Sequence, residues 1–488
     1  MSTTSIAYEP VIGLEIHVQL STRTKMFCGC ELSFGDPPNT HTCAVCLGLP
    51  GALPVVNARA IHYALMVGLA LGCELAPRSI FHRKNYFYPD LPKGYQISQY
   101  DIPICSGGHL GDVRIHRAHL EEDAAKLIHV GASGRIHGAD SSVVDYNRGG
   151  TPLVEIVTEP DVHSAAQARE WLTLLRTTLR QLGVSDVNME EGSLRCDANV
   201  SIRPVGSDVL GTKTELKNMN SFRYLERGVD AEIARQIAIV EGGGEVVQET
   251  LHYDPVSGAI SSLRSKEEAH DYRYFPEPDL VPIVLTEEMI AAAKAELPEL
   301  PAQRAERYET ELGLSADSAR LLSFRPELGD YFEAALASAP TGRTSEPLAG
   351  ESPQVLANWI SGELIARIGD EDPAQSKVEP VAIAKLVALV RARAVTQGAA
   401  KQVLDKLVAD GGDPAAIVEA EGLGAIGGGD ELAEVVRRAL ESDPDAVAKL
   451  KGGNMKAIGP IVGFVMRETK GRADGGEVTR IVREQLGL

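Results

Sequence analysis

The chain has 488 residues, of which 44% are hydrophobic and 24% charged, and its formal net charge at pH 7 is −20. This composition is typical of a folded globular protein and excludes a disordered or fibrous one. The length predicts two to four domains, and the negative charge argues against a protein that coats nucleic acid over its whole surface.

The N-terminal residues and the longest apolar stretch both predict a cytoplasmic protein. Residues 1–7 have no basic region and no long apolar region, so we expect no signal peptide. The apolar stretch 58–75 contains Arg59, His62 and Glu74, which predicts a buried helix and not a membrane span. Seven cysteines, an odd number, indicate a reducing compartment. We therefore expect no contact with a membrane.

Residues 1–285 consist of short alternating runs broken by Gly, Pro, Asn and Asp, which predicts a β-rich α+β domain. Residues 11–20 alternate apolar and polar side chains, so Glu15 and His17 lie on one strand face, roughly 7 Å apart. Residues 193–203 repeat this pattern and align Arg195 and Asp197, among others, on one face.

Two further segments between these strands, 119–123 and 153–157, add Glu122 and Glu155. A sheet that faces solvent also alternates, and this interpretation stays open from the pattern alone. A solvated face is usually rich in Lys, Thr and Gln, whereas carboxylates and a histidine recur here. If the four segments share one sheet, they form a concave acidic surface suited to a hard cation.

Four of the cysteines form two close pairs, Cys28-x-Cys30 and Cys43-x-x-Cys46, separated by a loop rich in Gly and Pro. This spacing predicts a structural Zn²⁺ knuckle with four thiolate ligands and no open position. The alternative is four unrelated reduced cysteines.

The sequence becomes helical and rich in Ala after a segment with several prolines at 275–282. Thr286 is the expected N-cap of the first helix, and amphipathic helices are predicted at about 354–367 and 380–394, after a loop at 341–353. We expect a helical domain at 286–410 and a small helical tail at 411–488.

The tail contains a basic segment, residues 449–483, with eight Lys or Arg against three Asp or Glu. Its lysines and arginines can contact phosphates without reading bases, or they can simply form a solvated helix face. The sequence has no G-x-x-x-x-G-K-[ST] loop, so any ATP site is of another kind.

Many long segments resemble the B subunit of the aspartyl/glutamyl-tRNA amidotransferases, the GatB family, over essentially the whole chain. The segments are 13–17 (GLEIH), 83–96 (RKNYFYPDLPKGYQ), 119–123 (HLEED), 145–148 (DYNR), 151–157 (TPLVEIV), 194–199 (LRCDAN), 217–222 (KNMNSF), 357–364 (ANWISGEL) and 470–473 (KGRA). The resemblance implies a β-rich cradle, a helical domain and a helical tail that binds tRNA.

The resemblance also implies the reaction. ATP phosphorylates the side-chain carboxylate of Glu or Asp misacylated on tRNA(Gln) or tRNA(Asn), and ammonia displaces phosphate to give the amide, so the chain is the kinase and transamidase subunit of a ligase. Phosphate is needed because a free carboxylate has a poor leaving group, and the transfer requires Mg²⁺ and positive donors. Both Asp-tRNA(Asn) and Glu-tRNA(Gln) stay open as substrates.

The resemblance implies roles for particular residues. It assigns catalytic roles to Glu15, His17, Glu122, Glu155 and Asp197, with His17, Glu122 and Glu155 as Mg²⁺ ligands. Arg195 and Lys217 are the expected phosphate-binding groups because they alternate onto polar strand faces. Within the basic segment of the tail, the expected tRNA contacts are Lys451, Lys456, Lys470 and Arg472.

The resemblance implies partners as well. The sequence has no G-G-S-S-G-G-type serine loop with its lysines, so ammonia must come from a separate glutaminase or amidase, the A subunit, which together with a small C subunit completes a heterotrimer. A non-catalytic tRNA-binding adaptor is the alternative. A zinc-dependent hydrolase is disfavoured because the four-cysteine site is full.

Overall fold

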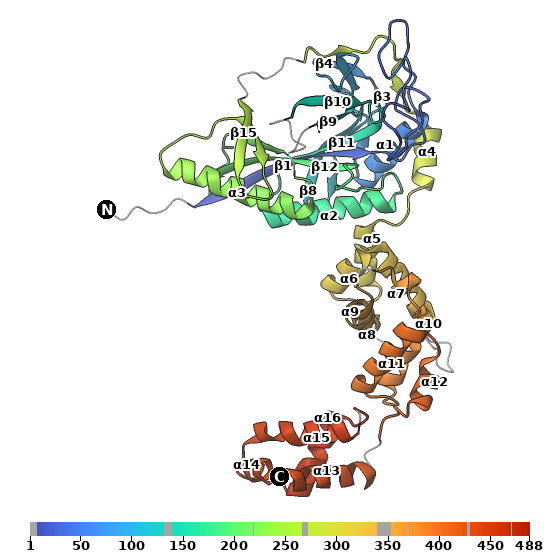
Figure 1. The fold of residues 1–488 in the computed structure, drawn as a ribbon, viewed down its shortest axis with the longest axis vertical. Helices are drawn as coiled ribbons and strands as arrows, with labels where there is room; N and C mark the ends of the chain where they lie inside the picture. Colours follow the sequence, from blue (N-terminus) through green and yellow to red (C-terminus); the bar gives the residue numbers. More distant parts are fainter. Residues whose placement is uncertain are drawn as a thin grey trace. The chain divides into compact units, whose positions relative to one another are not determined.

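A computed structural model of the protein describes residues 7–130, 139–217, 219–265, 272–338, 353–369, 371–426, 430–469 and 471–488. The chain divides into two compact units, Met1–Leu300 and Pro301–Leu488. The first unit combines a large mixed sheet with helices, and the described part of the second is helical (Figure 1). The predicted α+β class is therefore confirmed, and the division into three domains stays a prediction.

Most described strands of the first unit form one 13-stranded mixed sheet. Its main path runs through β15 (Ile260–Ser265), β14 (Glu249–Tyr253), β13 (Thr214–Lys217), β12 (Leu194–Pro204), β1 (Tyr8–Gln19), β11 (Pro152–Thr158), β8 (Val113–Glu122), β5 (Tyr95–Ser98), β4 (His82–Asn85) and β16 (Phe275–Pro276). Beside this path lie β2 (Glu74–Leu75), β6 (Cys105–Ser106) and β7 (His109–Leu110). Two small sheets pair β9 (Lys126–Val130) with β10 (Ser141–Asp145), and β3 (Arg78–Ser79) with β17 (Ile283–Val284).

One face of the sheet is apolar and packs on helices, which leaves the other face for polar side chains. Ile12, Leu14, Ile16 and Val18 of β1 are fully buried in a core that includes residues of the helices. These helices are α1 (Ala58–Ala70), α2 (Ala165–Gln181), α3 (Phe222–Glu241) and α4 (Glu287–Ala295). The predicted buried helix in 58–75 is thus found as α1.

Local signals explain where these helices begin. The side chains of Asn57, Ser164 and Ser221 accept hydrogen bonds from backbone N–H groups in the first turns of α1, α2 and α3. Thr286 caps α4 by accepting from the Met289 N–H, as predicted. The core of the first unit continues through this helix, since Ala293 is fully buried in it.

The second unit contains two hydrophobic cores, one built from residues between Tyr308 and Leu423 and one from residues between Leu432 and Val482. The first core is formed by α5 (Pro301–Thr310), α6 (Ala316–Ser323), α7 (Pro326–Ala337), α8 (Pro353–Asn358), η2 (Trp359–Leu364), α9 (Ile365–Ile368), α10 (Pro380–Arg391), α11 (Gln397–Asp410) and α12 (Pro414–Ala420). The second is formed by α13 (Asp430–Ser442), α14 (Pro444–Lys451), α15 (Ile458–Glu468) and α16 (Gly475–Leu486). The helices predicted near 354–367 and 380–394 are confirmed, and nearly all of the predicted loop at 341–353 lies outside the described residues.

Candidate active site

Four neighbouring strands carry polar side chains that lie opposite one another. His17 on β1 is paired with Arg195 on β12 and with Glu155 on β11. Glu155 is in turn paired with His119 on β8. Since side chains alternate between the two faces of a sheet, this row projects from the face opposite the helices. The four segments therefore share one sheet, as the acidic-surface hypothesis requires.

His17 forms a three-residue cluster with two carboxylates, which we call the acidic cluster. Its Nε2 lies 3.4 Å from Glu155 Oε2 and 3.6 Å from Glu121 Oε1. One ligand atom from each residue lies within 4.8 Å of the others. A cation about 2.1 Å from each of its ligands holds neighbouring ligand atoms about 3 Å apart. The acidic cluster therefore fits one divalent cation after small side-chain movements, with positions left for substrate or water.

The charge state of the acidic cluster also suits a cation. Burial lowers the pKa of His17, but the hydrogen bond to Glu155 and the negative charges of Glu155 and Glu121 raise it to about 9. Burial disfavours the ionised form of Glu155, yet His119 and His17 hold the pKa of its carboxyl well below its usual range. These pKa shifts favour a protonated His17 beside an ionised Glu155 at neutral pH, and a cation held by the cluster would take the place of that proton.

Side chains of the neighbouring strand β8 orient Glu155 from the side opposite His17. His119 Nε2 lies 3.4 Å from Glu155 Oε2, and the Arg117 Nε–H donates to His119 Nδ1 at 3.3 Å. His119 is nearly fully buried. Such outer partners fix the orientation of a ligating carboxylate.

The acidic cluster opens into a cleft of about 260 Å³, the active-site cleft. The cleft is lined by His17, Lys84, Tyr86, Gln96, Glu121, Asp123, Ala124, Leu153, Arg195 and Asp197. Arg195 Nη2 lies 3.0 Å from Asp123 Oδ1, and Lys217 Nζ lies 2.6 Å from Asp197 Oδ2. The two predicted phosphate-binding groups thus lie at this face, each already paired with a carboxylate.

Besides Arg195, the cleft is lined by a second cationic side chain, Lys84, which the sequence did not single out. Burial lowers its pKa, but the negative charges of Glu121 and Glu155 help to raise it above the ordinary value. Among the described residues it has no carboxylate within ion-pair distance, which leaves its ammonium more available to an incoming anion than those of the paired cations.

Glu122 points away from the cleft. Its carboxylate accepts a hydrogen bond from the Ile97 N–H at 3.0 Å and forms an ion pair with Lys93. Because successive side chains of β8 face opposite ways, Glu121 and Glu122 cannot both reach His17. The structure does not gather Glu122 with the predicted ligands, and Glu121 occupies that position.

The other predicted catalytic residues lie at the same face, outside the acidic cluster. Asp197 lines the active-site cleft. Glu15 is paired with Asp197 across β1 and β12, and its Oε1 accepts a hydrogen bond from Asn199 Nδ2 at 2.9 Å. Glu15 therefore belongs to the polar face without contacting His17.

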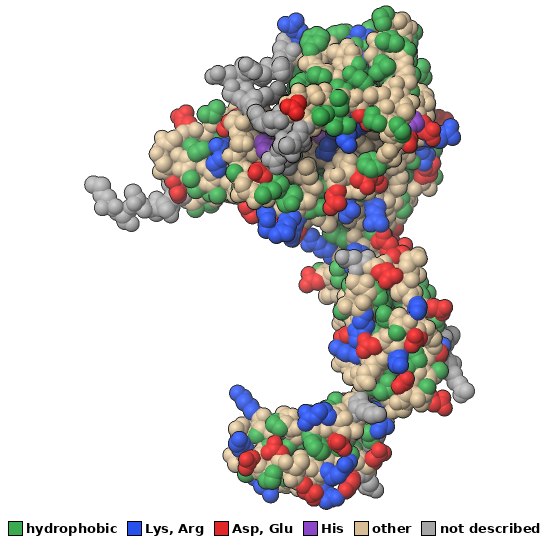
Figure 2. All heavy atoms as spheres, viewed as in Figure 1, with side chains coloured by type: hydrophobic (Ala, Val, Ile, Leu, Met, Phe, Trp, Pro, Cys, Tyr) green, Lys and Arg blue, Asp and Glu red, His purple; other side chains and the backbone are tan. Residues whose placement is uncertain are grey.

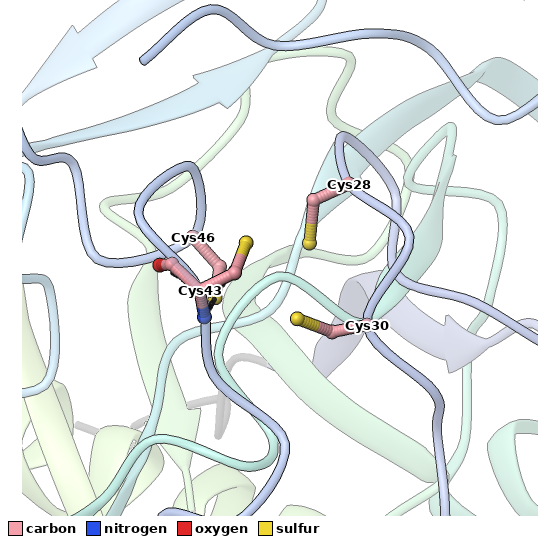
Figure 3. Close-up of side chains that lie close together, drawn as sticks. All are labelled: Cys28, Cys30, Cys43 and Cys46. Atoms are coloured by element: carbon pink, nitrogen blue, oxygen red, sulfur yellow. Dashed lines mark hydrogen bonds between the residues drawn. The ribbon is translucent and has the colours of Figure 1, made fainter. Parts of the chain in front are cut away.

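The four predicted zinc ligands come together in space. Cys28, Cys30, Cys43 and Cys46 point toward a common centre, and one sulfur from each lies within 4.8 Å of the others (Figure 3). The Cys43 and Cys46 sulfurs are 3.9 Å apart, close to the roughly 3.8 Å expected for thiolates around tetrahedral zinc. The geometry is therefore compatible with structural zinc, and the alternative of unrelated cysteines is disfavoured.

The contacts within the cysteine cluster favour the thiolate form of Cys46. A hydrogen bond from the Cys28 thiol lowers the pKa of Cys46 to about 4, with help from the Cys43 N–H and the charge of Lys25. The Cys43 N–H lies 3.1 Å from Cys46 Sγ. Metal binding requires deprotonated sulfur, so these contacts support the same role.

The basic segment of the tail presents several unpaired cations. Lys449, Lys451 and Lys456 are exposed and have no acidic partner among the described residues. Arg472 is half-buried, and its Nε–H donates to the Thr469 carbonyl at 3.2 Å. The fourth predicted tRNA contact, Lys470, lies outside the described residues. In Figure 2 the Lys and Arg side chains of the C-terminal helices α13 to α16 are interspersed with Asp and Glu.

Comparison with known proteins identifies the family of this chain. Residues 10–291 match the GatB/GatE catalytic domain, and residues 346–486 match the GatB domain. The chain is 46% identical to the aspartyl/glutamyl-tRNA(Asn/Gln) amidotransferase B subunit of Geotalea daltonii, over 98% of this chain and 99% of the relative. It is 48% identical to the protein of the same name from Anaeromyxobacter sp. (strain K), with the same coverage of both chains. It is also 46% identical to that of Persephonella marina, again over 98% of this chain and 99% of the relative.

The two matched domains and the near-complete coverage of these relatives give the class, that of the B subunits of aspartyl/glutamyl-tRNA(Asn/Gln) amidotransferases. The chain belongs to the GatB family. Within the described residues, no helix is long and apolar enough to cross a membrane.

Proposed function

We propose that this chain is the subunit that activates and amidates the side-chain carboxylate of Glu or Asp misacylated on tRNA(Gln) or tRNA(Asn), using ATP and ammonia. The observation that carries this proposal is the acidic cluster beside cationic side chains in one open cleft, in a member of the GatB family. A non-catalytic adaptor has no need of such a cluster.

The described side chains suit phosphoryl transfer to a carboxylate. Both reactants are anions, so the site must screen their repulsion and hold them in line. His17, Glu121 and Glu155 would hold Mg²⁺, which when bound neutralises charge on the γ-phosphate. Lys84 and Arg195 line the same cleft and offer N–H donors to phosphate oxygens.

The second half of the reaction needs ammonia and no strong base from this chain. Ammonia attacks the acyl carbon, the C–N bond forms and the C–O bond to phosphate breaks, so phosphate leaves with one oxygen of the original carboxylate and can accept the proton that ammonia loses. Ammonia comes from a glutaminase, the A subunit, which assembles with this chain and a small C subunit. The four-cysteine site would hold structural Zn²⁺ through all four thiolates, with no position left for chemistry.

Reconstituting the complex of the three subunits tests the proposal directly. With ATP, Mg²⁺ and glutamine, we expect conversion of Asp-tRNA(Asn), Glu-tRNA(Gln) or both to the amide, together with ADP formation. A complex that binds both tRNAs but neither hydrolyses ATP in their presence nor forms an amide would establish the adaptor alternative.

We predict that the tail binds the tRNA backbone through its unpaired lysines. Replacing Lys449, Lys451 and Lys456 by Gln should lower affinity for tRNA and reduce the slope of log affinity against log salt by about 0.7–0.9 for each lost phosphate contact. Neutralising these side chains is preferable to truncating the tail, because α13 shares a core with α15 and α16.

The matched control is Arg437→Gln on the same bundle, because Arg437 is already paired with Glu434 and Glu441. Binding isotherms at two or more salt concentrations provide the measurement. If the triple variant has the same slope of log affinity against log salt as the intact protein, these lysines are solvent-exposed side chains that do not contact tRNA.

A further inference from the structure

Four tyrosines form a continuous chain of ring contacts, which we call the aromatic track. Tyr86 contacts Tyr272 edge-on with ring centroids 6.1 Å apart, and Tyr272 contacts Tyr274 in the same way at 6.0 Å. Tyr274 stacks face to face on Tyr100, with centroids 4.1 Å apart and planes 7° apart. The sequence is only 5% aromatic, so this concentration of rings from three places in the chain requires an explanation.

The aromatic track leads from the active-site cleft to the surface. Tyr86 lines the cleft together with Lys84, whose Nζ lies 5.0 Å from the centre of the Tyr272 ring. At the other end Tyr100 is 56% exposed. A ring that served only the hydrophobic core would be buried, so the outer end of the track is available to a ligand.

Hydrogen bonds hold the track against the neighbouring strand β4. The Asn85 side chain donates to the carbonyls of Tyr272 and Arg273, at 3.2 and 2.8 Å. Arg273 has φ 45°, in the left-handed region that a side chain rarely adopts. Just beyond it, β16 pairs with β4, and Arg83 binds Glu277 through two hydrogen bonds of 2.7 and 2.8 Å. Such preorganisation of partly exposed rings is typical of a binding surface.

We propose that the aromatic track binds the unpaired 3′-terminal nucleotides of the aminoacyl-tRNA, and this rests on the function proposed above. Single-stranded bases stack on aromatic side chains, and a nearby cation neutralises the phosphates that connect them. Lys84 supplies that cation where the track meets the cleft. Nucleotides stacked along the track would direct the esterified amino acid toward the acidic cluster.

The test uses the three-subunit complex and misacylated tRNA with 2-aminopurine at its 3′ end, whose fluorescence is quenched on stacking. Tyr274→Leu and Tyr100→Leu should each lose most of the quenching and raise KM for aminoacyl-tRNA about tenfold, within the range for one stacked base, with kcat nearly unchanged. Tyr274→Phe and Tyr100→Phe keep the ring and should behave like the parent protein. Phe34→Leu alters an exposed aromatic side chain outside the track and serves as the control.

Leu variants that quench and bind like their Phe counterparts would overturn the proposal. So would loss of the partner subunits from the Leu variants on size-exclusion chromatography, because the track would then dock a protein. If the parent complex forms no amide at all, the proposed function fails. If the parent complex forms amide but the Leu variants quench the fluorescence as the parent does, the track proposal fails and the proposed function stands.

Discussion

Replacing Glu155 by Gln is expected to reduce amide formation about 10³-fold while leaving the fold intact. Glu155 lies between His17 and His119, at 3.4 Å from each imidazole, so its charge is central to the site. Gln keeps the shape but removes that charge, and losing one preorganised electrostatic contact typically costs 10²–10³-fold in rate. Single-turnover amidation by the reconstituted complex measures the effect, and circular dichroism checks the fold.

Three further variants accompany this experiment: one is a control, and two test which glutamate of β8 is the Mg²⁺ ligand. Glu159→Gln removes a partly exposed carboxylate paired with His116 outside the acidic cluster, and should be close to neutral. Glu121→Gln should raise the Mg²⁺ concentration needed for half-maximal activity, whereas Glu122→Gln should leave that concentration unchanged, whatever its effect on rate. Near-normal amidation by Glu155→Gln, or a Mg²⁺ requirement that shifts with Glu122 and not Glu121, would refute the assignment.

Removing zinc is expected to unfold the cysteine loop before it affects the chemistry. Structural zinc contributes on the order of 10 kcal/mol to local folding, so the four-thiolate site should dominate the stability of residues 25–50. We predict one Zn²⁺ per chain by elemental analysis, and loss of that ion in Cys28→Ser. Hydrogen exchange should then increase first in residues 25–50.

The control for the zinc experiment is Cys73→Ala, because Cys73 is buried in the first unit and outside the cluster. This variant should keep one Zn²⁺ per chain. Metal-free protein with a protected loop at 25–50 would contradict the prediction.

Features encoded locally in the sequence could be predicted. The alternation in residues 11–20 and 193–203 predicts β1 and β12 and places His17 and Arg195 on polar faces. The cysteine pairs and the Thr286 cap depend on spacings of a few residues, and the structure contains both.

Features that depend on long-range pairing could not be predicted. Alternation shows that Glu121 and Glu122 face opposite ways, but which of them faces His17 depends on the register of β8 against β11. Lys84 enters the cleft only because β4 joins the sheet through β5. The stacking of Tyr100 on Tyr274 joins segments far apart in the chain.

The same distinction applies to the end of the first unit. The change to helical sequence at Thr286 is real, yet α4 packs into the core of the sheet unit because its apolar side completes that core. Periodicity identifies a helix but does not identify the core that it joins.

The most direct test of the central claim follows one oxygen atom. Misacylated tRNA whose side-chain carboxylate carries ¹⁸O is converted by the complex with ATP and ammonia, and the released phosphate is analysed by mass spectrometry. Activation by phosphorylation predicts one ¹⁸O in the phosphate for each amide formed, with both products lost together in Glu155→Gln. Amide formation with phosphate free of ¹⁸O would show that the carboxylate is not activated by phosphoryl transfer at this site.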